Sequence, residues 1–237
     1  MPTQQRRLTD VAAIVPAAGM GKRFGGAIQK PFVKLGGLPL LVQTLRVLQN
    51  SPTIRWMVVV VRAGEEARVA ALLKPHRLTK ISSICPGGAS RADSVAKGFR
   101  VLPDAAQWVL VHDAARPCVS AALIKRVVGA AHRYGAVACG LPAMLTVKEA
   151  DSRGRVRRTL DRSRLWLVQT PQVFRRDWFA QALRRGRRRL DQFPDDVAIL
   201  ESAGFPVRMI PGDPLNLKVT TREDLVVAEA ILTSRHR

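Results

Sequence analysis

The chain is poor in acidic and aromatic residues and has no long apolar run. Its 237 residues include 18 Asp and Glu against 39 Lys and Arg, a formal net charge of +21, and 5% are Phe, Trp or Tyr. No apolar run approaches the ~20 residues that span a bilayer. Residues 1–10 are polar and lack the apolar centre of a secretory signal. We therefore expect a soluble, cytoplasmic protein without a membrane partner.

Cysteine is also scarce. The three cysteines, Cys85, Cys118 and Cys139, are widely separated in the sequence. Their spacing matches no metal-binding pattern such as C-x-x-C, and their number is odd. We expect free thiols in or near the core.

The excess of basic residues suggests a nucleic-acid-binding protein as one hypothesis. The densest run, residues 184–189, falls late in a predicted helix and contains no aromatic side chain that would stack on bases. This favours a solvated helix face over a specific nucleic-acid surface. A positive field would still attract phosphorylated substrates to the protein.

Apolar periodicity predicts a chain in which strands and helices alternate. Residues 11–15 and 56–61 are near-continuous apolar runs, typical of strands buried in a parallel sheet. The further predicted strands cover residues 80–85, 108–111, 136–141, 207–210 and 217–219. The predicted helices cover residues 39–49, 65–73, 90–102, 123–134, 178–190, 195–203 and 221–232.

This alternation predicts an α/β fold with a doubly wound, mostly parallel sheet, in a single domain over residues 1–237. Residues 146–158 differ, since they are polar, alternate in character and contain a turn at 151–154. We expect a projecting β-hairpin there. Because such an arm cannot bury a core by itself, it is expected to pack on a second subunit.

The loop after the first strand has the composition of a phosphate site. Residues 17–21 are small or unbranched, so the backbone can approach a ligand closely, and Lys22, Arg23 and Lys30 add positive charge. The P-loop pattern fails because Gly21-Lys22 is followed by Arg23. The dinucleotide fingerprint fails because Phe24 stands where a small residue is required. The simpler hypothesis is a glycine-rich turn with incidental cations.

Seven sequence blocks resemble one enzyme family. They are PAAGMGKRF (16–24), Lys30, GGASRADSV (87–95), VHDAARP (111–117), TLDRSRLW (159–166), QTPQVF (169–174) and LKVT (217–220). In this order they resemble the 2-C-methyl-D-erythritol 4-phosphate cytidylyltransferases of the non-mevalonate isoprenoid pathway. The resemblance covers residues 11–232. It implies a Rossmann-like nucleotidyltransferase fold.

The resemblance also implies a reaction and a set of site residues. The acceptor phosphate attacks the α-phosphorus of CTP, and pyrophosphate leaves with Mg²⁺ present. The implied catalytic residues are Arg23, Lys30 and Lys218, and the implied nucleotide-binding residues are Ala17, Ala18, Gly19, Gly88 and Ser94. The implied acceptor-binding residues are Asp113, Arg116, Thr146, Arg162 and Thr170, with Asp113 also as a Mg²⁺ ligand and some residues contributed across a homodimer by the arm.

Several of these residues have simpler interpretations. Asp113 could be a helix cap, Lys218 a surface lysine and Ser94 an ordinary helix residue. The chemistry nevertheless suits them, because a carboxylate at a strand end beside a triphosphate is a good Mg²⁺ partner. An arginine and hydroxyl cluster likewise suits a phosphate dianion.

The sequence departs from the family pattern in the substrate pockets. Ala89 replaces an expected acidic residue near cytosine, Leu145 an expected Asp, and Pro194 a frequent Thr. Gln29-Lys30-Pro31 replaces the more usual Pro-Lys-Gln. A cytidylyltransferase for another polyol phosphate, such as ribitol 5-phosphate, is therefore a competing hypothesis. Two further hypotheses are a basic nucleic-acid-binding protein and a regulatory nucleotide-binding domain without catalysis.

Overall fold

A seven-stranded sheet organises the computed structural model, which describes residues 10–19 and 30–235. The strand order is β11-β7-β10-β6-β1-β4-β5. The strands are β1 (Val11–Pro16), β4 (Ile54–Val61), β5 (Ile81–Pro86), β6 (Trp108–Val111), β7 (Ala136–Pro142), β10 (Trp166–Arg175) and β11 (Arg208–Pro211). β10 runs antiparallel to both β6 and β7, whereas the other neighbours are parallel.

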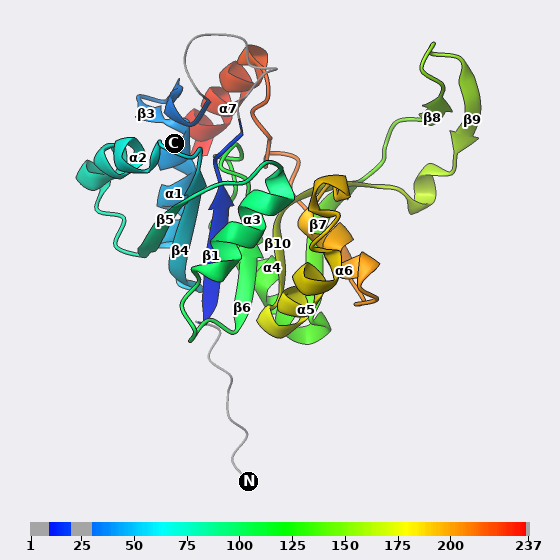
Figure 1. Ribbon diagram of the computed structural model, residues 1–237. Helices are drawn as coiled ribbons and strands as arrows, with labels where there is room; N and C mark the ends of the chain where they lie inside the picture. Colours follow the sequence, from blue (N-terminus) through cyan, green and yellow to red (C-terminus); the bar gives the residue numbers. More distant parts are fainter. Residues whose placement is uncertain (1–9, 20–29, 236–237) are drawn as a thin grey trace.

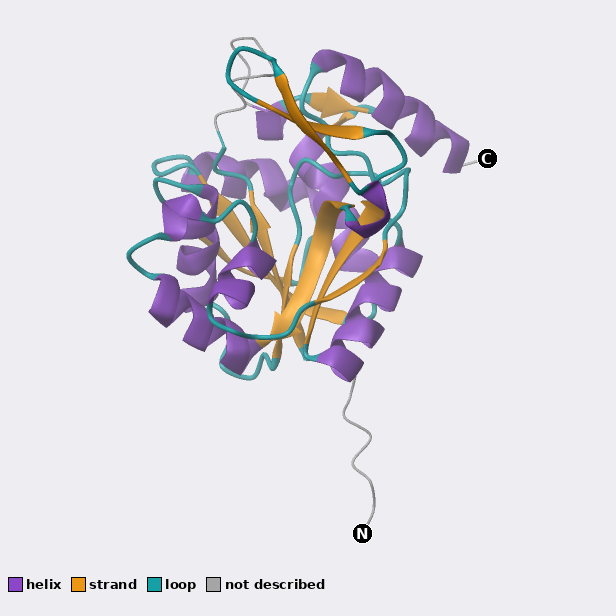
Figure 2. Cartoon of the chain, turned by 90° about the vertical axis from the view of Figure 1, so that its right-hand side faces the viewer, coloured by secondary structure: helices purple, strands orange, loops and turns teal. Residues whose placement is uncertain are grey.

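Helices cover both faces of this sheet (Figure 2). They are α1 (Leu40–Asn50), α2 (Glu66–Leu73), α3 (Arg91–Arg100), α4 (Ala121–Tyr134), α5 (Arg176–Gly186), α6 (Asp196–Ser202) and α7 (Arg222–Arg235). Successive residues of β1 point to opposite faces, as the pleat of a strand requires. Ala13 packs with residues of α1, α2 and α4, whereas Ile14 packs with residues of α3, α5 and α6. The predicted doubly wound α/β fold is thus confirmed, with one antiparallel strand inserted.

Two small hairpins lie outside the main sheet. One pairs β2 (Lys34–Leu35) with β3 (Leu38–Pro39). The other pairs β8 (Val147–Ala150) with β9 (Val156–Leu160) and projects from the body of the molecule, as Figure 1 shows. The predicted hairpin at 146–158 is confirmed, and we call residues 144–164 the arm. Asp151 forms its turn, because Oδ1 accepts hydrogen bonds from the N–H groups of Arg153 and Arg155, both at 3.0 Å.

Two predictions of secondary structure were wrong. Residues 217–219 are not a strand, because this segment makes one backbone bond, from Val219 N–H to Ala115 O at 2.8 Å, and no ladder. The basic helix predicted at 178–190 ends at Gly186, so that Arg187 and Arg188 lie in a turn. In addition, no strand was predicted where β10 lies, a segment that contains Pro171 and three buried polar residues.

All three cysteines are buried and carry free thiols, as predicted. Among the described residues, no helix is long and apolar enough to cross a bilayer.

Candidate active site

The main cavity opens at the carboxyl ends of the parallel strands, where ligands of doubly wound folds bind. Its volume is about 550 Å³. The loop after β1 (17–19), the loop after β5 with the start of α3 (88–91) and the segment after β6 (113–115) form its walls, together with Lys30 and Lys218. The structure thus brings together the predicted residues Ala17, Ala18, Gly19, Lys30, Gly88, Ser94, Asp113 and Lys218. Arg23 lies outside the described residues.

The nucleotide side of the cavity depends on small residues. A Cβ atom at Gly87 would lie 2.6 Å from Ala18 Cβ and 2.8 Å from Ser94 Oγ, so only glycine allows these loops to meet. Ser94 Oγ accepts a hydrogen bond from Gly88 N–H at 3.0 Å and donates one to Ser90 O at 2.9 Å. The Ser94 hydroxyl therefore holds the loop in shape. Ser90 caps the start of α3, since its Oγ accepts a hydrogen bond from the N–H of Asp93 at 3.0 Å.

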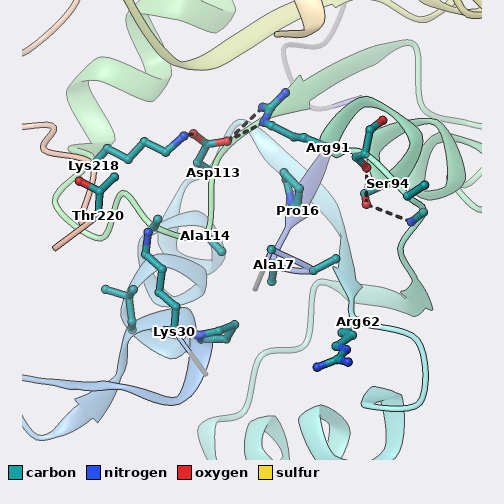
Figure 3. A pocket seen from close by; sticks show the side chains of 18 residues that line it. Pro16, Ala17, Lys30, Arg62, Arg91, Ser94, Asp113, Ala114, Lys218 and Thr220 are labelled. Atoms are coloured by element: carbon teal, nitrogen blue, oxygen red, sulfur yellow. Dashed lines mark hydrogen bonds and ion pairs between the residues drawn. The ribbon is translucent and has the colours of Figure 1, made fainter. Parts of the chain in front are cut away.

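Asp113 is the electrostatic centre of the opposite wall (Figure 3). Arg91 Nε and Nη2 donate to Asp113 Oδ1 at 3.1 and 3.0 Å, and Lys218 Nζ lies 2.8 Å from Oδ2. Burial alone would raise the pKa of Asp113, but the charges of Arg91 and Lys218 outweigh it and hold the pKa well below its usual range. The site therefore contains an ionised carboxylate between two cations.

Two predicted acceptor residues, Thr170 and Arg116, lie behind Asp113 and do not line the cavity. Thr170 Oγ1 accepts a hydrogen bond from Asp113 N–H at 3.0 Å and lies 3.1 Å from His112 Nδ1. His112 Nε2 lies 3.1 Å from Arg116 O. Burial lowers the pKa of His112 to about 4, so the ring is neutral near pH 7. In the tautomer that fits these partners, the Thr170 hydroxyl donates to Nδ1 and Nε2–H donates to the carbonyl.

Lys218 is positioned by the buried residues on either side of it. Asn216 is fully buried, and its Nδ2 donates to Thr170 O at 2.8 Å. Val219 is fully buried beside Leu35 and Leu40. The segment therefore fixes the lysine without the predicted strand.

The structure adds residues that the sequence analysis did not assign. Arg62, after β4, lines the cavity away from Asp113 (Figure 3). Arg91 lines it as well and also contacts Asp196, with Nη2 2.9 Å from Oδ2. Arg91 lies within the GGASRADSV block, but Asp196 is 105 residues away in the sequence. No local pattern could have shown that pairing.

The remaining predicted acceptor residues lie on the arm. Thr146 is exposed and directly precedes β8, and Arg162 Nη1 donates to Met144 O at 2.6 Å. Neither lines the cavity of its own chain. Leu145 is 82% exposed beside them.

No protein-only metal site occurs among residues 10–19 and 30–235, since no group of three or more His, Cys, Asp or Glu side chains could hold an ion there. Among the described residues that line the cavity, Asp113 is the one with a carboxylate side chain. Mg²⁺ commonly takes one or two carboxylates plus phosphate oxygens. The donor set therefore fits a Mg²⁺ ion that receives most of its ligands from a bound phosphate chain and water.

Comparison with known proteins gives the family. The model of the family 2-C-methyl-D-erythritol 4-phosphate cytidylyltransferase (IspD) matches residues 11–234. A protein of that name from Syntrophus aciditrophicus is 41% identical over 223 residues, covering 94% of this chain and 95% of its own length. One from Pelotomaculum thermopropionicum is 42% identical over 226 residues, covering 95% of each chain.

Solved structures of proteins with these names have the same fold. The 4-diphosphocytidyl-2C-methyl-D-erythritol synthase of Anaerococcus prevotii superposes with a TM-score of 0.82 at 26% identity, covering 95% of this chain and 99% of its own. The 2-C-methyl-D-erythritol 4-phosphate cytidylyltransferase of Thermus thermophilus gives 0.76 at 31% identity, covering 94% and 98%. The resemblance inferred from the seven sequence blocks is confirmed. The chain belongs to the 2-C-methyl-D-erythritol 4-phosphate cytidylyltransferase family.

Proposed function

We propose that this chain transfers CMP from CTP to 2-C-methyl-D-erythritol 4-phosphate by means of fixed positive charge around the cavity. As a member of its family it is a cytidylyltransferase of the non-mevalonate isoprenoid pathway. The observation that carries the mechanism is the convergence of Lys30, Lys218 and Asp113 on a cavity walled by small-residue loops. A phosphate oxygen of the acceptor attacks the α-phosphorus of CTP. The bond between the α-phosphorus and the oxygen that bridges it to the β-phosphorus breaks, and pyrophosphate leaves.

The cytidine and the triphosphate occupy the side formed by residues 17–19 and Gly88. Backbone groups contact the base there, since Ala17, Ala18 and Gly19 present little side chain. Lys30 binds phosphate oxygens, and Arg23 is assigned the same role by the family resemblance. Such charges stabilise the transition state of phosphoryl transfer, in which charge is spread over equatorial oxygens.

Lys218 stabilises the charge that develops on the α-phosphate. Its ammonium forms an ion pair with Asp113 Oδ2, and this contact keeps the ammonium beside the cavity. The pair is accessible, because the Lys218 side chain is 40% exposed. When the triphosphate binds, the ammonium can contact both the carboxylate and a phosphate oxygen.

A Mg²⁺ ion bound beside the triphosphate would supply neutralising charge at the phosphoryl oxygens. Asp113 would be its protein ligand, although Oδ1 already accepts from Arg91 and Oδ2 from Lys218. The Asp113 carboxylate would hold the ion once the Lys218 ammonium turns toward a phosphate oxygen. Asp113 also accepts hydrogen bonds from the hydroxyl groups of the acceptor.

The arm completes the acceptor site of a second subunit in a homodimer. It exposes apolar side chains, with Met144 at 78%, Leu145 at 82% and Val156 at 54%. A two-stranded hairpin is marginally stable alone, so these side chains need a surface to cover them. A second copy covers them and receives Thr146 and Arg162 at its cavity. These residues suit a phosphate dianion.

The test measures pyrophosphate release with Mg²⁺ and CTP, in the presence of methylerythritol 4-phosphate, ribitol 5-phosphate or no acceptor. Release with methylerythritol phosphate alone is expected. Release with ribitol phosphate alone would mean that the departures at Leu145 and Pro194 mark a changed acceptor. No release in any of the three reactions, with CTP bound, would reject the enzymatic proposal.

A further inference from the structure

Arg91 connects the two walls of the cavity. It is the first residue of α3, directly after the cap residue Ser90, so its backbone belongs to the nucleotide loop. Its guanidinium points to the opposite wall, where Nε and Nη2 both donate to Asp113 Oδ1 (Figure 3). Two donors on one oxygen fix the carboxylate more closely than a single bond. The other oxygen, Oδ2, is left facing Lys218.

Asp196 holds the guanidinium from behind. It is fully buried, and its Oδ2 accepts from Arg91 Nη2 at 2.9 Å. It does not line the cavity. Its contact with the cavity wall is therefore made through Arg91.

Asp196 is itself fixed to the central sheet. Its N–H and that of Val197 donate to Gln172 Oε1 of β10 at 3.2 and 3.1 Å. Gln172 Nε2 donates in turn to Asp195 Oδ2 at 3.0 Å. The start of α6, and with it Asp196, is thus held by backbone and side-chain bonds to a strand in the middle of the sheet. This makes it a rigid support for the long arginine side chain.

We propose that Arg91 and Asp196 are positioning residues for acceptor binding, which hold the Asp113 carboxylate so that Oδ2 faces the acceptor and the Lys218 ammonium. This inference rests on the proposed contact between Asp113 and the acceptor. Neither residue touches the reacting phosphorus. Since small displacements of a positioning group can lower a rate by about 100-fold, loss of the pair should be measurable in steady-state kinetics.

The variants must avoid leaving a charge buried alone, because an unpaired buried charge can unfold the protein. Arg91→Gln combined with Asp196→Asn removes both charges together and keeps side chains that can hydrogen-bond. Arg91→Lys keeps the charge but not the planar two-donor contact. Arg176→Gln is the matched control, since Arg176 donates to Pro103 O at 2.6 Å at the far end of the sheet.

The expected result separates the two substrates. In R91Q/D196N, the KM for methylerythritol phosphate rises on the order of 10-fold, while the KM for CTP changes by less than about 3-fold. R91K recovers part of the acceptor affinity. R176Q behaves as the unaltered enzyme.

Asp113→Asn separates this inference from the proposal on which it rests. If D113N leaves the acceptor KM unchanged, the proposed contact with the acceptor is wrong, and the inference falls with it. If D113N raises the acceptor KM and folded R91Q/D196N does not, only the positioning role of the pair is overturned. Equal increases in both KM values in R91Q/D196N would also overturn it, since they indicate general damage to the cavity.

Discussion

The cavity and the arm hold their charged residues in opposite ways. In the cavity, Asp113 is 6% exposed and its carboxylate contacts Arg91 and Lys218. On the arm, the ion pair between Arg158 and Glu149 has side chains that are 70% and 42% exposed. Charges that are buried and hydrogen-bonded keep a fixed geometry, whereas exposed pairs are screened and mobile. We therefore propose that residues of the arm form part of a site only when a second copy packs against them.

Lys218→Ala should have the largest effect. Loss of a charge-stabilising group in a preorganised site lowers kcat by about 100- to 1,000-fold. Because the side chain is 40% exposed, the fold should be retained. Pyrophosphate release gives the rate, and a thermal melt shows that the protein is folded. An unchanged kcat would remove Lys218 from the mechanism and leave it as a partner of Asp113 only.

The buried network behind Asp113 should make stability depend on pH. The folded pKa of His112 is lowered to about 4 by burial, against about 6.5 for an exposed histidine. Between these values the unfolded chain binds the extra proton. Stability is thus fully present above pH ~6.5 and is lost as the pH falls toward ~4, by about 3 kcal/mol from this group. The groups facing the ring are Asp113, Arg116 and Thr170.

Urea unfolding of the protein and of His112→Asn, at several pH values and without Mg²⁺, would measure this contribution. The asparagine variant should be less stable at pH 7 but should lose less stability between pH 6.5 and 4. Parallel curves for the two proteins would show that the ring is not the group responsible.

The arm should determine the oligomeric state. Met144→Glu with Leu145→Glu places charge on two side chains that are 78% and 82% exposed. If a second copy covers them, this double variant elutes as a monomer, and the acceptor KM rises on the order of 10-fold because Thr146 and Arg162 are withdrawn.

Val226→Glu with Val227→Glu is the matched control, since these side chains on α7 are 70% and 51% exposed but lie outside the arm. It should elute as the unaltered protein does. An unaltered protein that is monomeric at every concentration would contradict the dimer.

The cavity loops and β10 differ in what the sequence could predict. The cavity loops follow strands that are apolar and continuous, so the β1 loop and Asp113 could be placed from local pattern. β10 could not, because its buried residues Gln169, Thr170 and Gln172 are polar and their partners lie in distant segments. In single-sequence reasoning a polar run with a proline favours a loop.

The same limit applies to the site. The assignment of a strand at 217–219 was wrong because a short apolar pattern does not distinguish a strand from an extended segment, and here Val219 packs against α7. Arg91 was visible as part of a block, but its role depends on Asp196, which only the fold brings near. A local sequence pattern does not show which distant segments of the chain contact each other.

The smallest effect should come from the ion pair of the arm. Glu149→Ala with Arg158→Ala removes a contact with Nε 2.6 Å from Oε2, shorter than the 3.0 Å between Arg91 Nη2 and Asp113. Distance alone would make it the stronger pair. The pair is nevertheless expected to be weak because it is exposed. Exposed ion pairs contribute about 0–1 kcal/mol to the free energy of unfolding and are screened by salt. Urea unfolding of the double variant should give a midpoint close to that of the unaltered protein, whereas a loss of several kcal/mol would mean that these side chains are buried against a second subunit.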